Sequence, residues 1–140
     1  MPKENNINPN YKLKNMNEQE ILNQGTKIGH ALRLDGVKPA QVNKLLEILE
    51  FEEEPKSAIT LLSIYVQRQR ARKLIGNRSA QQILNAMVNL LNSNPENKDE
   101  ARKILGVAKW VYEALGDYRP IPREIPDIQV LLRTFLQGGR

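Results

Sequence analysis

The sequence predicts an all-α fold, a compact bundle of five to six helices. Apolar residues recur at three- and four-residue intervals along the 140-residue chain, the spacing that lines one face of a helix. Leu, Ile and Ala supply most of the apolar mass and aromatic residues make up only 5%, as helix packing prefers. No segment alternates apolar and polar residues with β-branched enrichment, so we expect no strand.

The first helix is predicted from Asn17 to about Leu34. Asn17 and Glu20 have the spacing of a capping box, in which each side chain accepts from the other residue's backbone N–H. Its buried positions are expected at Ile21, Gly25, Ile28 and Leu32. Residues 1–16 are rich in Asn and Lys, and we expect a flexible arm there, followed by one helical domain over residues 17–140.

The second helix is predicted between two breaks in the chain. Asp35 and Gly36 end the first helix, and Pro39 suits a first-turn position of a helix that runs to Phe51. Its buried positions are expected at Val42, Leu45, Leu46 and Leu49. The pair at 54–55, Glu-Pro, breaks the chain again.

The third and fourth helices are predicted on either side of Gly76. The third runs from Ser57 to Ile75 with Gly76 as its C-terminal cap, and its broad apolar first half indicates a position in the middle of the bundle. In its second half the core positions are expected at Ile64, Ala71, Leu74 and Ile75. Ser79 and Gln82 form a capping box for a fourth helix to Asn92.

The outward face of the fourth helix is polar but uncharged, with amides at Gln81, Gln82, Asn85, Asn89 and Asn92. Ordinary solvated faces carry Lys and Glu, so this face indicates a contact surface. Its opposite, buried stripe is expected at Ile83, Ala86, Met87, Leu90 and Leu91.

Asn97 and Glu100 predict the cap of a fifth helix that runs to Leu115. Seven apolar residues fall on one side of it: Ala101, Ile104, Leu105, Ala108, Val111, Tyr112 and Leu115. Trp110 falls opposite that stripe, beside Lys103 and Gly106. An exposed Trp usually has a partner, and we consider three: another protein, a stacked base, or the Pro-rich segment 117–126 folded over it. That segment must be extended, and a short last helix follows, with apolar residues at Ile128, Leu131, Leu132 and Phe135.

Several classes of chemistry lack their residues. With no Cys and only His30, the chain offers neither a His/Cys zinc site nor a His-paired nucleophile, and His30 falls on the polar side of the first helix, facing solvent. The run Glu50 to Glu54 lacks the spacing of a calcium loop and is interpreted as a solvated helix end. We therefore expect no enzyme activity, catalytic residue, metal or cofactor. Without a signal peptide or a membrane-length apolar run, we expect a cytoplasmic protein with no membrane partner.

Positive charge is concentrated in one part of the chain. The formal net charge is +5, and residues 55–95 contain no Asp or Glu. A stretch without carboxylates is what a phosphate-facing surface requires. The predicted nucleic-acid-binding residues are Arg68, Gln69, Arg70, Arg72, Lys73, Arg78 and Asn85. The alternative is a solvated helix end in which the cations interact only with the helix dipole.

Two short segments resemble the small subunit of type III CRISPR effector complexes, the all-helical Csm-type family. They are residues 36–46, Gly-Val-Lys-Pro-Ala-Gln-Val-Asn-Lys-Leu-Leu, and residues 110–118, Trp-Val-Tyr-Glu-Ala-Leu-Gly-Asp-Tyr. The resemblance implies a non-catalytic subunit that contacts the backbone of guide–target RNA, other effector-complex subunits and copies of itself along a filament. Under this hypothesis the partner interface would comprise Trp110, Lys103, Glu52 and Glu53.

Two other functions remain open. Residues 36–39 could form the turn of a helix-turn-helix in a stand-alone DNA-binding regulator, with Gln41, Asn43 and Lys44 leading its recognition helix. The acid-rich end of that helix, residues 47–54, disfavours approach to phosphates. The third hypothesis is a helical adaptor or scaffold, in which Trp110 marks a partner groove and the cations are idle.

Overall fold

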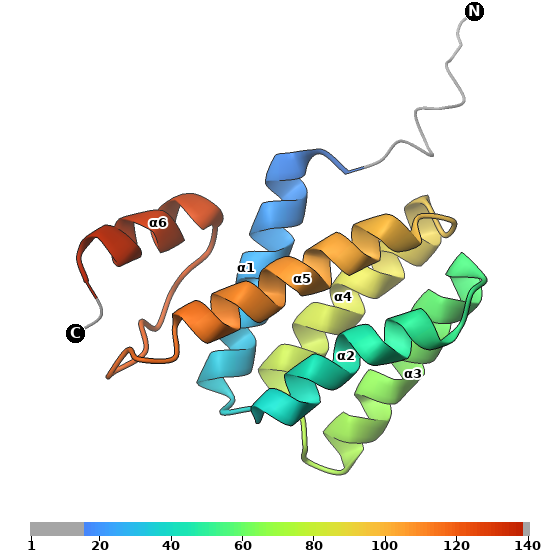
Figure 1. Ribbon diagram of the computed structural model, residues 1–140, viewed down its shortest axis with the longest axis horizontal. Coiled ribbons are helices and arrows are strands. Elements are labelled where there is room, and N and C mark those ends of the chain that lie inside the picture. The colour runs from blue at the N-terminus through green and yellow to red at the C-terminus, as the bar shows by residue number, and fades with distance from the viewer. Residues whose placement is uncertain (1–15, 139–140) are drawn as a thin grey trace, which may run out of the picture.

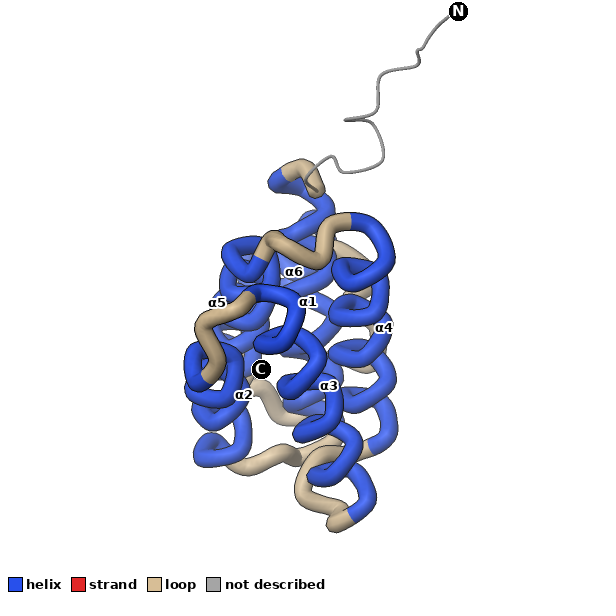
Figure 2. The backbone as a smooth tube through the Cα atoms, turned by 90° about the vertical axis from the view of Figure 1, so that its right-hand side faces the viewer, coloured by secondary structure: helices blue, strands red, loops and turns tan. Residues whose placement is uncertain are grey.

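The computed structural model describes residues 16–138, and every regular element in that part of the chain is a helix (Figures 1 and 2). The six helices are α1 (Glu18–Leu34), α2 (Pro39–Phe51), α3 (Pro55–Ala71), α4 (Asn77–Ser93), α5 (Lys98–Ala114) and α6 (Ile128–Leu136). The predicted all-α bundle is confirmed. No helix within residues 16–138 combines the length and the apolar character needed to span a membrane.

The predicted flexible arm lies outside the described residues, except for Met16. The backbone N–H of Met16 donates to the Glu100 carboxylate (2.8 Å), and its side chain packs against the core. Met16 therefore belongs to the bundle. Residues 139–140 also lie outside the described part.

Helices α1 and α5 form the tightest seam of the molecule and cross in Figure 1. The predicted capping box at Asn17 and Glu20 is confirmed, and the four predicted core positions of α1 are buried. Gly29 permits the close approach, because a Cβ there would lie 2.5 Å from the backbone oxygen of Ala108 on α5. All seven predicted apolar positions of α5 are buried as well.

Helices α2, α3 and α4 complete the main core. Val42, Leu45 and Leu49 of α2 are buried as predicted, and Leu46 is half-buried. On α4, Ile83, Ala86, Met87 and Leu90 are buried and Leu91 is half-buried. The predicted apolar stripes of these two helices therefore face the core.

The prediction that α3 lies in the middle of the bundle is wrong. Helix α3 packs against α2 and α4 at one edge, so its outer apolar side chains have no neighbouring helix (Figure 1). Ile64 is 60% exposed, and Ala71 and Leu74 are also exposed. Of the core positions predicted for the second half of α3, only Ile75 is buried, and it lies beyond the end of the helix.

The predicted boundary between α3 and α4 is also wrong. Helix α3 ends at Ala71, because Lys73 takes a left-handed conformation (φ 64°) and closes a Schellman turn. In that turn Leu74 N–H donates to Gln69 O (2.8 Å) and Lys73 N–H donates to Arg70 O (3.0 Å). Gly76 does not end α3; it is the N-cap residue of α4.

Helix α4 is capped by a residue from another part of the chain. The predicted capping box of Ser79 and Gln82 does not form, since α4 already begins at Asn77. Asp35, after α1, accepts from Ser79 N–H (2.8 Å) and Ser79 Oγ–H (2.7 Å) instead. A Cβ on Gly76 would lie 2.4 Å from Asp35 Oδ2, so only glycine leaves room for this cap.

A second, smaller apolar cluster joins α6 to the C-terminal half of α5. Its buried members are Val111, Leu115, Tyr118, Ile125 and Leu131. The segment between α5 and α6 crosses α1 and covers His30, so the expectation that His30 faces solvent is wrong. His30 is buried, and its Nε2–H donates to Pro122 O (2.6 Å).

Candidate nucleic-acid interface

Four of the predicted binding residues lie together where α3 ends. We call Arg68, Arg70, Arg72 and Lys73 the basic corner. Arg68, Arg72 and Lys73 are exposed, and Arg70 is half-buried. Among the residues that the structure describes, none of the four forms an ion pair. Their hydrogen bonds are to neutral groups, such as Asn77 Oδ1, which accepts from Arg70 Nε (3.2 Å).

Gln69 does not belong to this exposed surface, contrary to the prediction. It is 3% exposed, and its amide donates to Gln41 Oε1 on α2 (2.8 Å). The helical wheel put Gln69 outside the apolar stripe of α3, but α2 covers that side and supplies a polar partner. A ligand cannot reach Gln69 without separating the two helices.

Arg78 is directed away from the basic corner, toward α1. Its Nη1 lies 3.2 Å from Asp35 Oδ1, so this predicted binding residue is partly neutralised. Asp35 is the only carboxylate that pairs with any of the five predicted cations among residues 16–138. In the folded chain, residues 55–95, which contain no acid of their own, therefore have the Asp35 carboxylate beside them.

The amide face of α4 is open to solvent for most of its length. Gln81, Asn85, Asn89 and Asn92 are exposed and Gln82 is half-buried. The Asn85 side-chain oxygen accepts from the Gln81 amide at 3.3 Å. Asn85 is thus accessible, as predicted.

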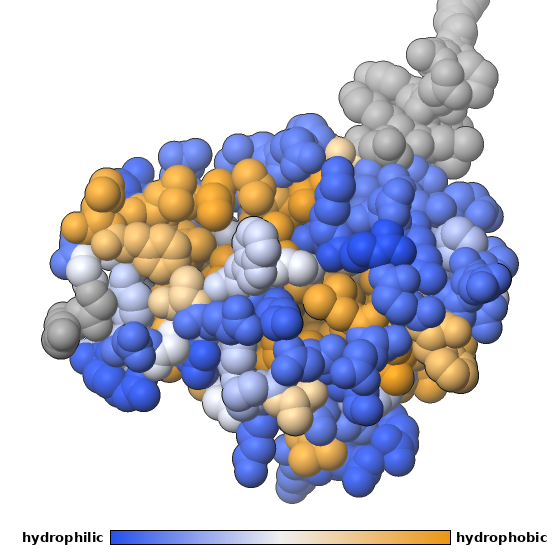
Figure 3. Space-filling model, in the orientation of Figure 1, coloured by the Kyte–Doolittle hydropathy of each residue, from blue (hydrophilic) through white to orange (hydrophobic). Residues whose placement is uncertain are grey.

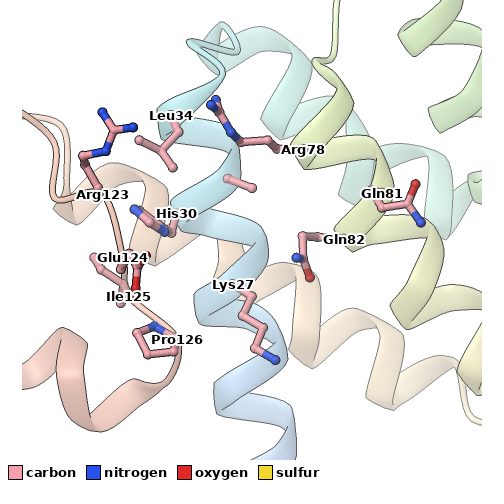
Figure 4. Close-up of a pocket in the computed structure, with 11 residues that line it drawn as sticks. Lys27, His30, Leu34, Arg78, Gln81, Gln82, Arg123, Glu124, Ile125 and Pro126 are labelled. Carbon is pink, nitrogen blue, oxygen red and sulfur yellow. The ribbon is translucent and has the colours of Figure 1, made fainter.

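Two cations near this face were not predicted. Lys27 on α1 and Arg123 in the segment after α5 line a cavity together with Arg78 (Figure 4). The sequence contains no signal for either residue, because their proximity depends on α1 packing beside α4 and on the course of the chain across α1. Lys27 also lines a second polar hollow farther along the α1–α4 groove, with Asn23, Gln24 and Asn89.

At the opposite end of the bundle the charges are paired. Glu50 on α2 binds Arg102 and Lys98 on α5, and Arg102 also binds Asp99. Hydrogen bonding to Arg102 lowers the pKa of Glu50 below its usual value. Glu54 accepts from Ser57 N–H (2.8 Å) and caps α3. The run Glu50 to Glu54 is therefore largely exposed, as expected, but Glu50 and Glu54 also make contacts that stabilise the fold.

Of the two acids predicted for a partner interface, Glu53 is exposed and Glu52 is half-buried. The Glu52 carbonyl oxygen accepts from Lys98 Nζ (2.7 Å), which fixes this turn against the start of α5. Trp110 lies twelve residues beyond Lys98, roughly 18 Å along the helix at 1.5 Å per residue. The structure therefore does not bring Trp110 together with these acids.

Trp110 is 75% exposed, so the segment between α5 and α6 does not cover it. It borders an apolar hollow of about 410 Å³ with Leu22, Leu46 and Val107. Lys103 lies on the rim of the same hollow and pairs with Glu18 at 3.6 Å. A further apolar surface gathers over α6, at the upper left of Figure 3, where Leu132 and Leu136 are exposed.

The described residues contain no cluster of three or more His, Asp or Glu side chains that could hold a metal ion. The helix-turn-helix hypothesis is disfavoured at Gln41, because the side-chain oxygen of this residue already accepts a hydrogen bond from Gln69.

Comparisons with protein-family models, with curated proteins and with solved structures found no match to this chain.

Proposed function

We propose that this chain is a non-catalytic nucleic-acid-binding subunit that holds an RNA backbone at the basic corner. One observation carries the proposal: four cations lie close together at the end of α3 without carboxylate partners within residues 16–138, whereas Lys98 and Arg102 at the other end of the bundle are paired. Unpaired guanidinium and ammonium groups bind phosphates without first breaking an ion pair, and they release counterions from the nucleic acid.

The contacts at the basic corner depend on the charge of the RNA backbone and not on the base sequence. Arg and Lys at an exposed helix end reach phosphate oxygens, which are the same at every nucleotide. The accessible amides of α4, including Asn85, would supply further contacts to sugars and phosphates. Recognition of a particular RNA would then require a separate partner, as the resemblance to small subunits of type III CRISPR effector complexes implies.

The exposed Trp110 favours a role in an assembly as well. A large aromatic side chain beside an apolar hollow is typical of the residues that contribute most to protein–protein binding. We propose that Trp110 and Lys103 contact another subunit or another copy of this chain. A helical adaptor that binds protein alone is the second candidate, and the RNA-binding experiment distinguishes it.

The proposal is tested with Arg68→Glu/Arg72→Glu in the full chain. Affinity for two unrelated single-stranded RNAs should fall at least tenfold, and equally for both sequences. Each lost phosphate contact should flatten the slope of log affinity against log salt by about 0.7 to 0.9. Fluorescence anisotropy at several salt concentrations measures both quantities, and a urea melt checks that the fold is intact.

The matched control is Lys56→Glu/Arg133→Glu, which changes the net charge by the same amount. Both control residues are exposed, and Lys56 lies at the other end of α3, roughly 24 Å from Arg72 at 1.5 Å per residue. The control should bind RNA nearly as the wild type does. Equal loss in both variants would mean that only net charge matters, and no loss in the first would contradict the basic corner.

A further inference from the structure

A cavity of about 450 Å³ lies between α1, α4 and the segment that joins α5 to α6 (Figure 4). Its floor is formed by residues of α1, including His30, Ala31 and Leu34. One wall is the start of α4, and the other is residues 123–126. Its volume lies within the range of about 300 to 1,000 Å³ found for small-molecule pockets.

The wall at residues 123–126 is fixed at two points. Immediately before it, Pro122 O accepts from the buried His30 (2.6 Å). Within it, Ile125 is 3% exposed and packs into the second apolar cluster. Arg123 lies between these two anchors, so its backbone position at the cavity rim is set by the fold.

Cationic side chains from three separate elements line this cavity. They are Lys27 of α1, Arg78 of α4 and Arg123. In Figure 4 the guanidinium groups of Arg78 and Arg123 lie on the same side of the cavity, with Leu34 between them. The acids nearby are Glu124, which also lines the cavity, and Asp35, which pairs with Arg78 Nη1. Three cations and one carboxylate therefore line the cavity, and Asp35 partly neutralises one of the cations.

The remaining lining residues suit the rest of a nucleotide. Guanidinium groups bind phosphate through paired N–H donors. Ala31, Leu34 and Pro126 provide an apolar surface for the face of a base. The carboxamide of Gln82 on the α4 wall offers both a donor and an acceptor to a base edge or a ribose.

We propose that this cavity binds one nucleotide unit, with its phosphate held by Arg78 and Arg123 on one side of the cavity and with Lys27 at its other end. The unit is either a free mononucleotide or one residue of an RNA strand. The α1–α4 groove continues past Lys27 into a polar hollow lined by Asn23, Gln24 and Asn89 and by one acid, Glu20, which leaves room for a strand to extend. The cavity is distinct from the basic corner, so either site can fail without the other.

The test uses the full chain and Lys27→Gln/Arg123→Gln. Lys27 and Arg123 are both exposed, so these changes should leave the urea melt unchanged. Calorimetric titrations use 5′-AMP, adenosine and a single-stranded RNA of about ten nucleotides. The control is Lys44→Gln/Arg133→Gln, which removes the same charge from exposed positions outside the cavity.

We expect the wild type to bind 5′-AMP more tightly than adenosine. We also expect the cavity variant to bind 5′-AMP at least tenfold more weakly than the control variant does. That result identifies a free nucleotide. If 5′-AMP does not bind but the RNA binds the cavity variant at least threefold more weakly than the control, the ligand is a strand. If the cavity variant and the control bind both probes alike, the proposal is overturned.

The same titrations separate this proposal from the proposed function. Arg68→Glu/Arg72→Glu should leave 5′-AMP binding unchanged while RNA binding falls. Loss of RNA binding in that variant, with no loss of either RNA or 5′-AMP binding in the cavity variant, would support the basic corner and refute the cavity. Loss only in the cavity variant would do the reverse.

Discussion

The two ends of the bundle carry clusters of cations that differ in one respect. Lys98 and Arg102, at the start of α5, are paired with Glu50 and Asp99 and join α2 to α5. The cations of the basic corner, at the end of α3, have no carboxylate partner within residues 16–138. The first cluster is used by the fold, and the second remains available to a ligand. The cations of the basic corner are distinguished by being both clustered and unpaired, whereas those at the start of α5 are clustered but already bound to carboxylates.

The helix dipole accounts for part of the basic corner. Arg68 and Arg70 lie in the last turn of α3, where the unpaired carbonyl groups attract positive charge. This interaction is worth only about 0.3 to 1 kcal/mol at an exposed site. It does not account for Lys73, which lies beyond the helix in a left-handed conformation that an L-amino acid rarely adopts.

The largest effect is expected on removal of Asp35, the one acid that pairs with a predicted binding cation among residues 16–138. Asp35→Ala deletes the acceptor for Ser79 N–H, Ser79 Oγ–H and Arg78. Because the cap of α4 is lost, the free energy of unfolding should fall by about 2 kcal/mol, the upper end of measured N-cap effects. Urea denaturation measures the change.

Asp35→Ala also releases Arg78 from its only ion pair among residues 16–138. If the ion pair with Asp35 keeps Arg78 from binding phosphate, this variant should bind RNA at least as well as the wild type despite its lower stability. Weaker RNA binding at a temperature where the variant is fully folded would contradict that view.

The next effect concerns Lys73, whose backbone conformation is unfavourable for any residue with a Cβ. Lys73→Gly should raise the free energy of unfolding by about 1 kcal/mol, because glycine is the preferred residue at this position of a Schellman turn. It should also weaken RNA binding, since one cation is lost. Thermal denaturation and anisotropy on the same sample test both expectations. A variant that gains stability and keeps full affinity would show that Lys73 does not contribute to RNA binding.

The smallest effect is expected at the paired end. Arg102→Gln removes the partner of Glu50, and both side chains are partly exposed, so the loss should be about 0.5 kcal/mol. The folded state lowers the pKa of Glu50 below its usual 4.5, so this contribution is complete above pH 4.5 and is lost as the pH falls through the lowered value.

The wild type and Arg102→Gln should therefore differ in urea stability at pH 7 and converge in acid. A difference that persists after Glu50 is protonated would show that Arg102 stabilises the fold by packing. RNA affinity should not change, because Arg102 is already paired in the wild type. Reduced affinity would contradict the comparison between the two ends.

The fold class and the registers of α1, α2, α4 and α5 could be predicted from the sequence because they depend on local signals. Apolar spacing and the caps at Asn17 and Asn97 identified α1 and α5, and both caps form. The boundary between α3 and α4 could not be predicted. A lysine closes the turn there in place of glycine, and the cap of α4 comes from a residue more than forty positions earlier.

The candidate sites could be predicted only in part, for a related reason. A helical wheel separates apolar from polar faces but does not reveal which polar face a neighbouring segment covers. Gln69 is covered by α2 and His30 by the segment near Pro122, and each finds a polar partner there. Conversely, Lys27 and Arg123 are far apart in the sequence and line one cavity only in the folded chain.

The cap supplied by Asp35 has a consequence for the order of folding. A helix begins to form with difficulty, because its first turn fixes several residues before any hydrogen bond compensates. The N-cap residue of α4, Gly76, has no side chain to accept a hydrogen bond. The first turn of α4 is therefore completed only when Asp35, in the turn between α1 and α2, has packed against it. We therefore expect the first turn of α4 to become ordered after the pairing of α1 with the rest of the bundle, and not as an autonomous nucleus.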